Sequence, residues 1–177
     1  MSPEHERLFD EFVAGRYSAL RRTGYLLCGD WHLAEDLVQT TLVKLYARWS
    51  RLHAPEAAYG YARTTLVRTY LDVRRRRGSH EVAAADPTDL LADGGEHGRR
   101  GTAAADPERR LALLAALAQV SPAYRAVLVL RFWEDQSIES TAAALRQSTG
   151  AVKSATNRGL TQLRGILGDS VHEIAAG

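Results

Sequence analysis

Hydrophobic residues recur every three or four positions along most of the chain, and strictly alternating hydrophobic and polar segments are nearly absent. This period is typical of amphipathic helices, which bury one side and expose the other. In the N-terminal part, Asp30 is a suitable N-cap for a helix that begins at Trp31. The hydrophobic positions of this part are Leu8, Phe9, Phe12, Val13, Tyr17, Leu20, Tyr25, Leu26, Leu27, Leu33, Leu37, Val38, Leu42, Leu45 and Trp49.

Pro55 interrupts this pattern, and a further helix is predicted from about Tyr59 into the arginines at 74–77. Gly78 is expected to end it. Its predicted buried side consists of Leu66, Val67, Tyr70 and Leu71.

The C-terminal part predicts several shorter helices. One begins near Pro107, and a second begins at Ser121-Pro122 and ends near Trp133. Ser137 can cap a helix over 138–145, and Ser148 can cap a longer one over 149–167. Two helices joined by a turn of about three residues make a candidate helix-turn-helix.

Between these parts, residues 78–107 are rich in Gly, Ala and Asp, and their only large hydrophobic residues are Val82, Leu90 and Leu91. Such a segment cannot bury enough surface to offset the entropy lost on ordering, so it is predicted to be a flexible linker. The expected fold class is all-α, with two small helical domains over about 1–77 and 108–177.

Composition narrows the class of protein. Hydrophobic residues make up 45% and charged residues 25% of the chain, which is typical of a globular protein. No hydrophobic run approaches the ~20 residues of a membrane span, and the N-terminus lacks the hydrophobic core of a signal peptide. The single cysteine, Cys28, excludes a disulfide within the chain, so a reducing, cytoplasmic location is expected.

Charge divides unevenly along the chain. Residues 51–77 carry seven Lys/Arg and two Asp/Glu, and residues 109–177 carry eight and five. Residues 78–108 instead carry two Lys/Arg and seven Asp/Glu. Two basic segments around an acidic one indicate two surfaces that face a polyanion.

A catalytic or metal site has one candidate. His32, Glu35 and Asp36 are three and four residues apart, so they can share one face of a helix. The same residues also suit the exposed, acidic start of a helix, where the dipole favours negative charge. The chain has no HExxH, CxxC or glycine-rich phosphate loop, so the second interpretation is preferred and no metal site is expected.

The helix before Gly78 has a composition suited to nucleic acid. Aromatic residues and arginines alternate in it, and bases of a single strand stack on rings while cations neutralise phosphate. The candidate residues are Tyr59, Tyr61, Arg63, Thr64 and Arg68, followed by Arg74, Arg75 and two further arginines.

Several motifs together resemble one family. "AEDLVQ" in the first domain and "AVLVLRFWEDQSIESTAAAL" and "GAVKS" in the second are similar to the extracytoplasmic-function sigma factors of the sigma-70 family. "LLCGDWHLAEDLVQ" and "RTTLVRTYLDVRRRR" resemble the SigE-like actinobacterial subfamily. The resemblance implies a transcription initiation factor, not an enzyme, that binds core RNA polymerase and promoter DNA and needs no cofactor.

The resemblance also implies roles for residues of the first domain. Asp36 and Gln39 match positions that dock on the clamp helices of the largest catalytic polymerase subunit. Segment 51–58 matches a specificity loop that captures a flipped base of the −10 element. The helix residues named above, Tyr59 to Arg75, match the part that contacts the melted −10 strand, although the family often has Asn near the position of Arg68.

In the second domain, the resemblance implies a helix that recognises the −35 element through Thr149, Lys153, Ser154, Asn157 and Arg158. Two positions depart from the family pattern. The turn carries Arg146-Gln147 where Gly and an aliphatic residue are common, and Ala155 replaces a common arginine. Arg146 could supply a phosphate contact instead, or the helix-turn-helix could pack more weakly.

Two alternatives remain open from the sequence. A helix-turn-helix regulator that binds duplex DNA without polymerase would explain the second domain, but not Asp36, Gln39 or the arginine-rich helix. A metal-dependent helical enzyme would use His32, Glu35 and Asp36. The sequence does not decide whether an anti-sigma factor is a partner.

Overall fold

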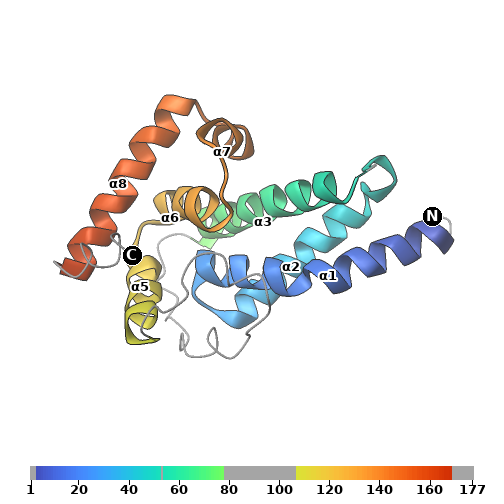
Figure 1. The fold of residues 1–177 in the computed structure, drawn as a ribbon, viewed down its shortest axis with the longest axis horizontal. Helices are drawn as coiled ribbons and strands as arrows, with labels where there is room; N and C mark the ends of the chain where they lie inside the picture. The colour runs from blue at the N-terminus through green and yellow to red at the C-terminus, as the bar shows by residue number, and fades with distance from the viewer. Residues whose placement is uncertain (1–2, 53, 78–106, 169–177) are drawn as a thin grey trace. The chain divides into compact units, whose positions relative to one another are not determined.

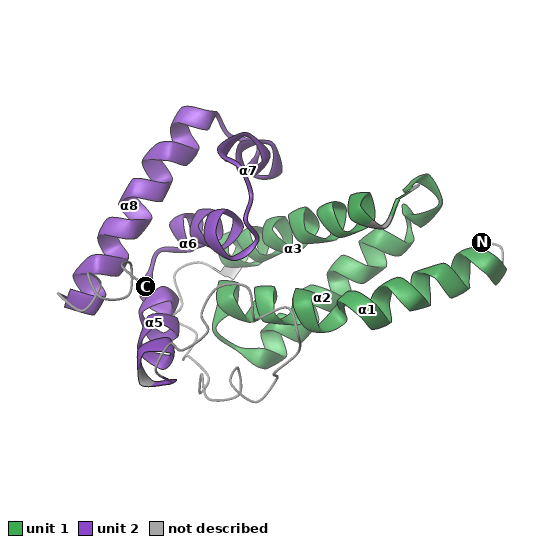
Figure 2. Ribbon diagram, viewed as in Figure 1, with its two compact units in different colours: residues 1–80 green, residues 81–177 purple. Residues whose placement is uncertain are grey.

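The computed structural model describes residues 3–52, 54–77 and 107–168, and every regular element in these ranges is a helix. The chain divides into two compact units, Met1–His80 and Glu81–Gly177 (Figure 2). The predicted all-α class is therefore confirmed. Most of the predicted linker, residues 78–106, lies outside the described residues.

Unit 1 consists of α1 (Pro3–Cys28), α2 (Trp31–Tyr46), the short 3₁₀ helix η1 (Trp49–Arg51) and α3 (Pro55–Arg77) (Figure 1). α1 and α2 form an antiparallel pair, and α3 packs against both. Asp30 caps α2 as predicted, because its carboxylate accepts a 2.7 Å hydrogen bond from the Leu33 amide. The fully buried side chains include Leu20, Leu27, Leu37, Val38, Leu45, Leu66, Val67 and Tyr70.

The start of α3 was predicted wrongly. The helix begins at Pro55, not near Tyr59, so the proline is its first residue. Proline suits this position because its fixed φ is helical and the first turn has no partner for an N–H. As a result, residues 55–58 of the supposed specificity loop are helical, and only residues 52–54 separate η1 from α3.

Aromatic side chains close the end of unit 1 where α2 meets η1. Phe9 of α1 makes edge-on contacts with Tyr46 at 5.0 Å and with Trp49 at 5.2 Å between ring centroids. The Trp49 indole N–H also donates a 3.0 Å hydrogen bond to the His5 carbonyl. These contacts fix the turn that follows α2 against the first helix.

Unit 2 consists of α5 (Pro107–Gln119), α6 (Pro122–Leu128), the π-helical segment η3 (Val129–Trp133), α7 (Ile138–Leu145) and α8 (Thr149–Leu167). The predicted helix from Ser121-Pro122 to Trp133 is confirmed, but its last turn is π-helical. The buried Arg125 holds α6 beside the end of α5, because its guanidinium donates to the carbonyls of Ala118 and Val120.

The longest helix of unit 2, α8, packs against α5, α6 and α7. Its buried side centres on Val152, which clusters with Val127 and Ala142. At Gly159 the contact with α6 is closest, since a Cβ there would lie 3.1 Å from the Leu128 side chain. A Cβ at this position fits only if the Leu128 and Tyr124 side chains shift by a few tenths of an ångström.

Candidate nucleic-acid and protein interfaces

One side of α2 faces away from the core of unit 1. His32, Asp36, Gln39 and Val43 are spaced by four, three and four residues, so they form one stripe, and all are exposed. The Val43 side chain is 70% exposed. None of the described residues pairs with Asp36 or Gln39. The stripe thus offers polar groups and one hydrophobic side chain to another molecule.

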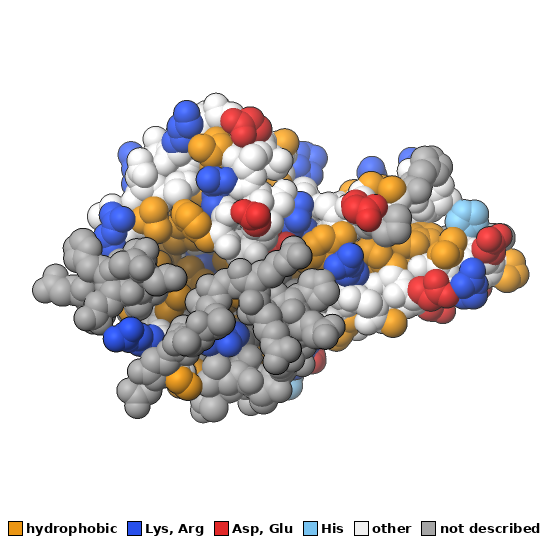
Figure 3. Space-filling view, in the orientation of Figure 1, with side chains coloured by type: hydrophobic (Ala, Val, Ile, Leu, Met, Phe, Trp, Pro, Cys, Tyr) orange, Lys and Arg blue, Asp and Glu red, His pale blue; other side chains and the backbone are white. Residues whose placement is uncertain are grey.

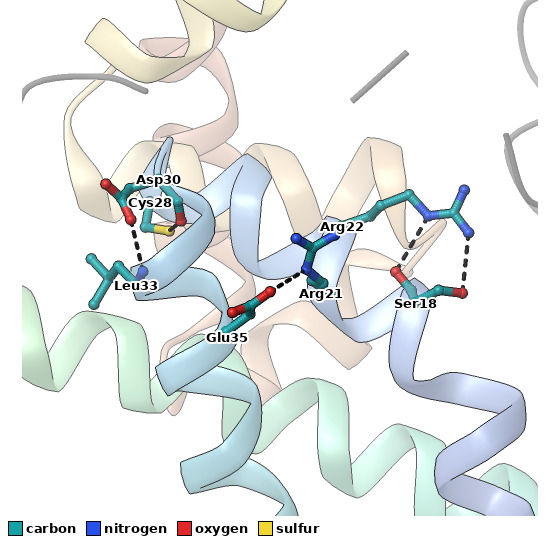
Figure 4. A network of polar contacts seen from close by, with 7 residues as sticks. All are labelled: Ser18, Arg21, Arg22, Cys28, Asp30, Leu33 and Glu35. Atoms are coloured by element: carbon teal, nitrogen blue, oxygen red, sulfur yellow. Dashed lines mark hydrogen bonds and ion pairs between the residues drawn. The ribbon is translucent and has the colours of Figure 1, made fainter. Parts of the chain in front are cut away.

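The three candidate metal ligands, His32, Glu35 and Asp36, do not share one environment. His32 and Asp36 are exposed, whereas Glu35 accepts a 2.9 Å charged hydrogen bond from Arg21 (Figure 4). The Arg21 guanidinium also lies 4.2 Å from the Trp31 ring, which stacks on Tyr25. Glu35 therefore orients an arginine between α1 and α2. Within the described residues, no three His, Cys, Asp or Glu side chains gather as a metal site would require.

The residues predicted to meet the −10 element lie on two sides of α3. Tyr61, Thr64, Arg68 and Arg75 are spaced by three, four and seven residues, which places them on one outward face. Arg75 is 79% exposed and pairs with Asp72 at 2.6 Å. This face combines a ring, a hydroxyl and two guanidinium groups.

Tyr59, Arg63 and Arg74 belong to the other side of α3, toward α1. Arg16 of α1 lies 5.1 Å from the Tyr59 ring centroid, and Arg63 lies 5.7 Å from it. Arg74 is partly buried, and its Nε has no hydrogen-bond partner among the described residues. The predicted set is thus not one stacking surface, because two residues of spacing on a helix turn a side chain to nearly the opposite side.

Sequence reasoning missed Arg48 as part of the outward face of α3. Arg48 is exposed in the turn after α2, and its guanidinium lies 5.7 Å from the Tyr61 ring centroid. The two residues come together because α3 packs against α2, which places its second turn near the end of α2. Helical periodicity within one segment carries no signal of such a contact.

The predicted helix-turn-helix is present as α7 and α8, joined by Arg146, Gln147 and Ser148. Ser137 caps α7 and Ser148 caps α8, each accepting a hydrogen bond from the amide three residues later, at 3.0 and 3.1 Å. Arg146 adopts the left-handed conformation with φ 55° and ψ 46°. The Gln147 amide reaches the Ala142 carbonyl at 2.9 Å, which closes a Schellman turn.

All five side chains predicted to read the −35 element are exposed on α8. Thr149, Lys153 and Asn157 are spaced by four residues and form one stripe, beside which Ser154 and Arg158 lie. Arg158 donates a 3.3 Å hydrogen bond to the Tyr124 hydroxyl of α6, which raises the pKa of its guanidinium. Figure 3 shows basic side chains over the part of unit 2 that contains α7 and α8.

Two family models match the chain, one in each unit. "Sigma-70 region 2" matches residues 12–80, and "Sigma-70, region 4" matches residues 110–163. The first match covers α2 and α3, and the second covers the helix-turn-helix. A helix-turn-helix regulator that does not bind polymerase has no need of the first region.

Similar proteins carry the same family name. The RNA polymerase sigma-E factor of Streptomyces avermitilis is 38% identical over 88% of this chain and 83% of its own length. The ECF RNA polymerase sigma factor SigE of Mycolicibacterium smegmatis is 32% identical over 94% of this chain and 64% of its own length.

A solved structure shares the fold. It is the sigma factor RpoE of Bartonella quintana in complex with the anti-sigma factor NepR, with a TM-score of 0.63 and 24% identity. The match covers 90% of this chain and 96% of that one. No helix in the described ranges is both long and hydrophobic enough to cross a membrane.

Sigma factors are transcription initiation factors that act with core RNA polymerase on promoter DNA and have no enzymatic activity of their own. From the two region matches and the similar sigma factors, the chain belongs to the extracytoplasmic-function sigma factors of the sigma-70 family and directs promoter recognition by RNA polymerase.

Proposed function

We propose that the exposed stripe of α2 docks on the clamp helices of the largest catalytic subunit of core RNA polymerase, with Asp36 and Gln39 as its central polar contacts. The observation that supports this most is that both side chains are exposed and no described residue of unit 1 pairs with them. A carboxylate pairs with cations across an interface, and an amide adds hydrogen bonds in either direction.

The outward face of α3 then contacts the melted −10 strand. Tyr61 supplies a ring on which a base stacks, Thr64 supplies a hydroxyl, and Arg68 and Arg75 neutralise phosphate. Tyr59, Arg63 and Arg74, on the side toward α1, are proposed to reach the nucleic acid only at the edge of this surface. The segment 51–58 captures a flipped base, whose unstacking cost of a few kcal/mol must be offset by contacts.

α8 reads the −35 element in duplex DNA. A recognition helix enters the major groove with its N-terminal residues toward the base edges, which suits Thr149, Lys153 and Ser154. Asn157 and Arg158 lie one turn further along. The proposed organisation is 1–77 for polymerase and −10 binding, 78–107 as a linker and 108–177 for −35 binding.

We also propose two properties that the fold alone does not decide. The chain acts in the cytoplasm, where core polymerase and promoter DNA are found. An anti-sigma factor is a further partner, since the Bartonella quintana sigma factor of the same fold was solved with one. Competition between such a protein and core polymerase for the purified chain would test this.

Reconstitution with sigma-free bacterial core polymerase tests the proposal. The full chain should form a complex with core polymerase and give specific run-off transcripts from a pool of genomic promoter fragments. The transcripts would also reveal the −10 and −35 sequences. If the chain bound duplex DNA but formed no complex with core polymerase, the docking role of Asp36 and Gln39 would be wrong.

A further inference from the structure

The turn of the helix-turn-helix runs through an unfavourable backbone conformation at Arg146. Its φ of 55° and ψ of 46° lie in the left-handed region, where a Cβ crowds the following carbonyl. Glycine is the usual residue at this position of a Schellman turn because it has no Cβ. An arginine here therefore makes the turn less stable than a glycine would.

The side chain of Arg146 makes no described contact that would offset this loss of stability. Arg146 is exposed, and no described residue accepts a hydrogen bond from its guanidinium or pairs with it. The five residues that follow, Gln147 to Ala151, are also exposed. The side chains of the turn and of the start of α8 are therefore open to another molecule.

The charge around the turn has one sign. Residues 146–168 contain four Lys/Arg and no Asp/Glu. Arg146 is two residues before the Ser148 cap, next to the end of α8 that carries Thr149 and Lys153. A strained residue that persists without a structural use is a pointer to function, and an exposed guanidinium in an all-basic segment suits a phosphate.

We propose that Arg146 contacts a backbone phosphate of the promoter duplex beside the −35 element, and so anchors the turn while α8 reads bases. This inference rests on the proposed role of α8. A phosphate contact fixes the register of a protein on DNA but carries no sequence information. Compared with a glycine, the arginine would thus make the turn less stable but would raise the affinity for any duplex.

The test compares Arg146→Gly and Arg146→Lys in the full chain. The control is Arg164→Gln, which removes the same charge in the last turn of α8, about 22 Å along the helix from its start. The probe is a mixed-sequence 20-base-pair duplex, and its affinity is measured by fluorescence anisotropy over a range of KCl concentrations. Hydrogen exchange of the α7 and α8 amides reports folding.

Loss of one phosphate contact should lower the slope of log K against log salt by about 0.9, and the affinity about five- to tenfold near 0.1 M salt. Arg146→Gly should show this loss while its amides exchange no faster than those of the unmodified chain. Arg146→Lys should stay within about threefold of the unmodified chain. Arg164→Gln should lose less than twofold.

Three results would overturn the inference. An unchanged salt slope in Arg146→Gly would show that no phosphate is contacted, and equal losses in Arg146→Gly and Arg164→Gln would show a diffuse charge effect. Faster amide exchange in Arg146→Gly would show a structural use for the arginine. If the unmodified chain bound neither this duplex nor the promoter fragments selected by run-off transcription, the role of α8 in the proposed function would fail instead.

Discussion

At the scale of single residues, Asp36 and Glu35 show how two neighbouring carboxylates acquire different uses. Glu35 is held by Arg21, while Asp36 is exposed and no described residue pairs with it. The sequence places both carboxylates near the start of a helix, but it does not show which of them pairs with another residue of unit 1. The deciding contact comes from α1, fourteen residues earlier in the chain.

Asp36→Arg should weaken binding to core polymerase by tenfold or more. In the proposed interface the Asp36 carboxylate pairs with cationic groups of the polymerase, and an arginine at this position would repel them. The free energy of unfolding should change by less than about 0.5 kcal/mol, as is usual for an exposed residue. Asp10→Arg is the matched control, since Asp10 is also an exposed aspartate of unit 1. Binding that survives Asp36→Arg would remove this residue from the polymerase interface.

A second residue, Thr141, is buried in α7, and its hydroxyl has no hydrogen-bond partner among the described residues. Thr141→Val should raise the free energy of unfolding of unit 2 by about 1 kcal/mol, because an unsatisfied buried polar group is removed with little change of shape. Thr156→Val is the control, since the Thr156 hydroxyl donates a 2.8 Å bond to the Val152 carbonyl. Hydrogen exchange of the α7 and α8 amides over a range of urea concentrations measures both, and a destabilised Thr141→Val would contradict the assignment.

At the scale of elements, local signals located most helix ends. The capping residues Asp30, Ser137 and Ser148 were predicted from the sequence and are confirmed by their hydrogen bonds. The start of α3 was missed because a proline both breaks a preceding helix and begins a following one. The π-helical segment η3 and the left-handed Arg146 carry no composition signal, so sequence reasoning could not find them.

The contact between α6 and α8 gives a prediction at this scale. Gly159→Val should lower the free energy of unfolding of unit 2 by about 2 kcal/mol or more, because its side chain must push into Leu128 and Tyr124. The same change at Gly165 should stay within about 0.5 kcal/mol, since nothing lies within 4 Å of a Cβ there. Similar losses at both glycines would mean that the close approach of Gly159 to α6 does not decide the result, because valine is itself a better helix former than glycine.

The proposed DNA contacts of α8 give another prediction at the scale of elements. Lys153→Gln and Arg158→Gln should each weaken binding to promoter DNA and reduce the salt slope by up to about 0.9 if each contacts one phosphate. If the contact is to a base, affinity should fall only for promoters with the preferred base at that position. Affinity measured on selected and mixed-sequence duplexes separates these cases, and no loss on either would exclude the side chain from the interface.

At the scale of the whole molecule, each unit has a hydrophobic core built from its own helices. A fragment of residues 1–80 should therefore fold alone, with the circular dichroism of a helical domain and protected amides in α1, α2 and α3. It should bind core polymerase in a manner that Asp36→Arg abolishes. A fragment that stayed unfolded would show that unit 1 depends on the rest of the chain.

The sequence predicted the all-helical class and the capping residues of three helices, because periodicity and capping are local properties. It could not predict how α3 would distribute its aromatic and basic residues. Tyr59 is enclosed by Arg16 and Arg63, whereas Tyr61 meets Arg48 from the preceding turn. These arrangements depend on which helices pack together, and so they appear only in the folded chain.

The exposed stripe of α2 has a consequence for how this protein changes over evolutionary time. Its inward side supplies Leu37, Val38 and Leu45 to the core, while the side chains on its outward side are exposed. Substitutions on the outward side are therefore nearly neutral for folding. With the docking role proposed for this stripe, natural selection could adjust how strongly the chain binds polymerase, one residue at a time, without first gaining stability elsewhere.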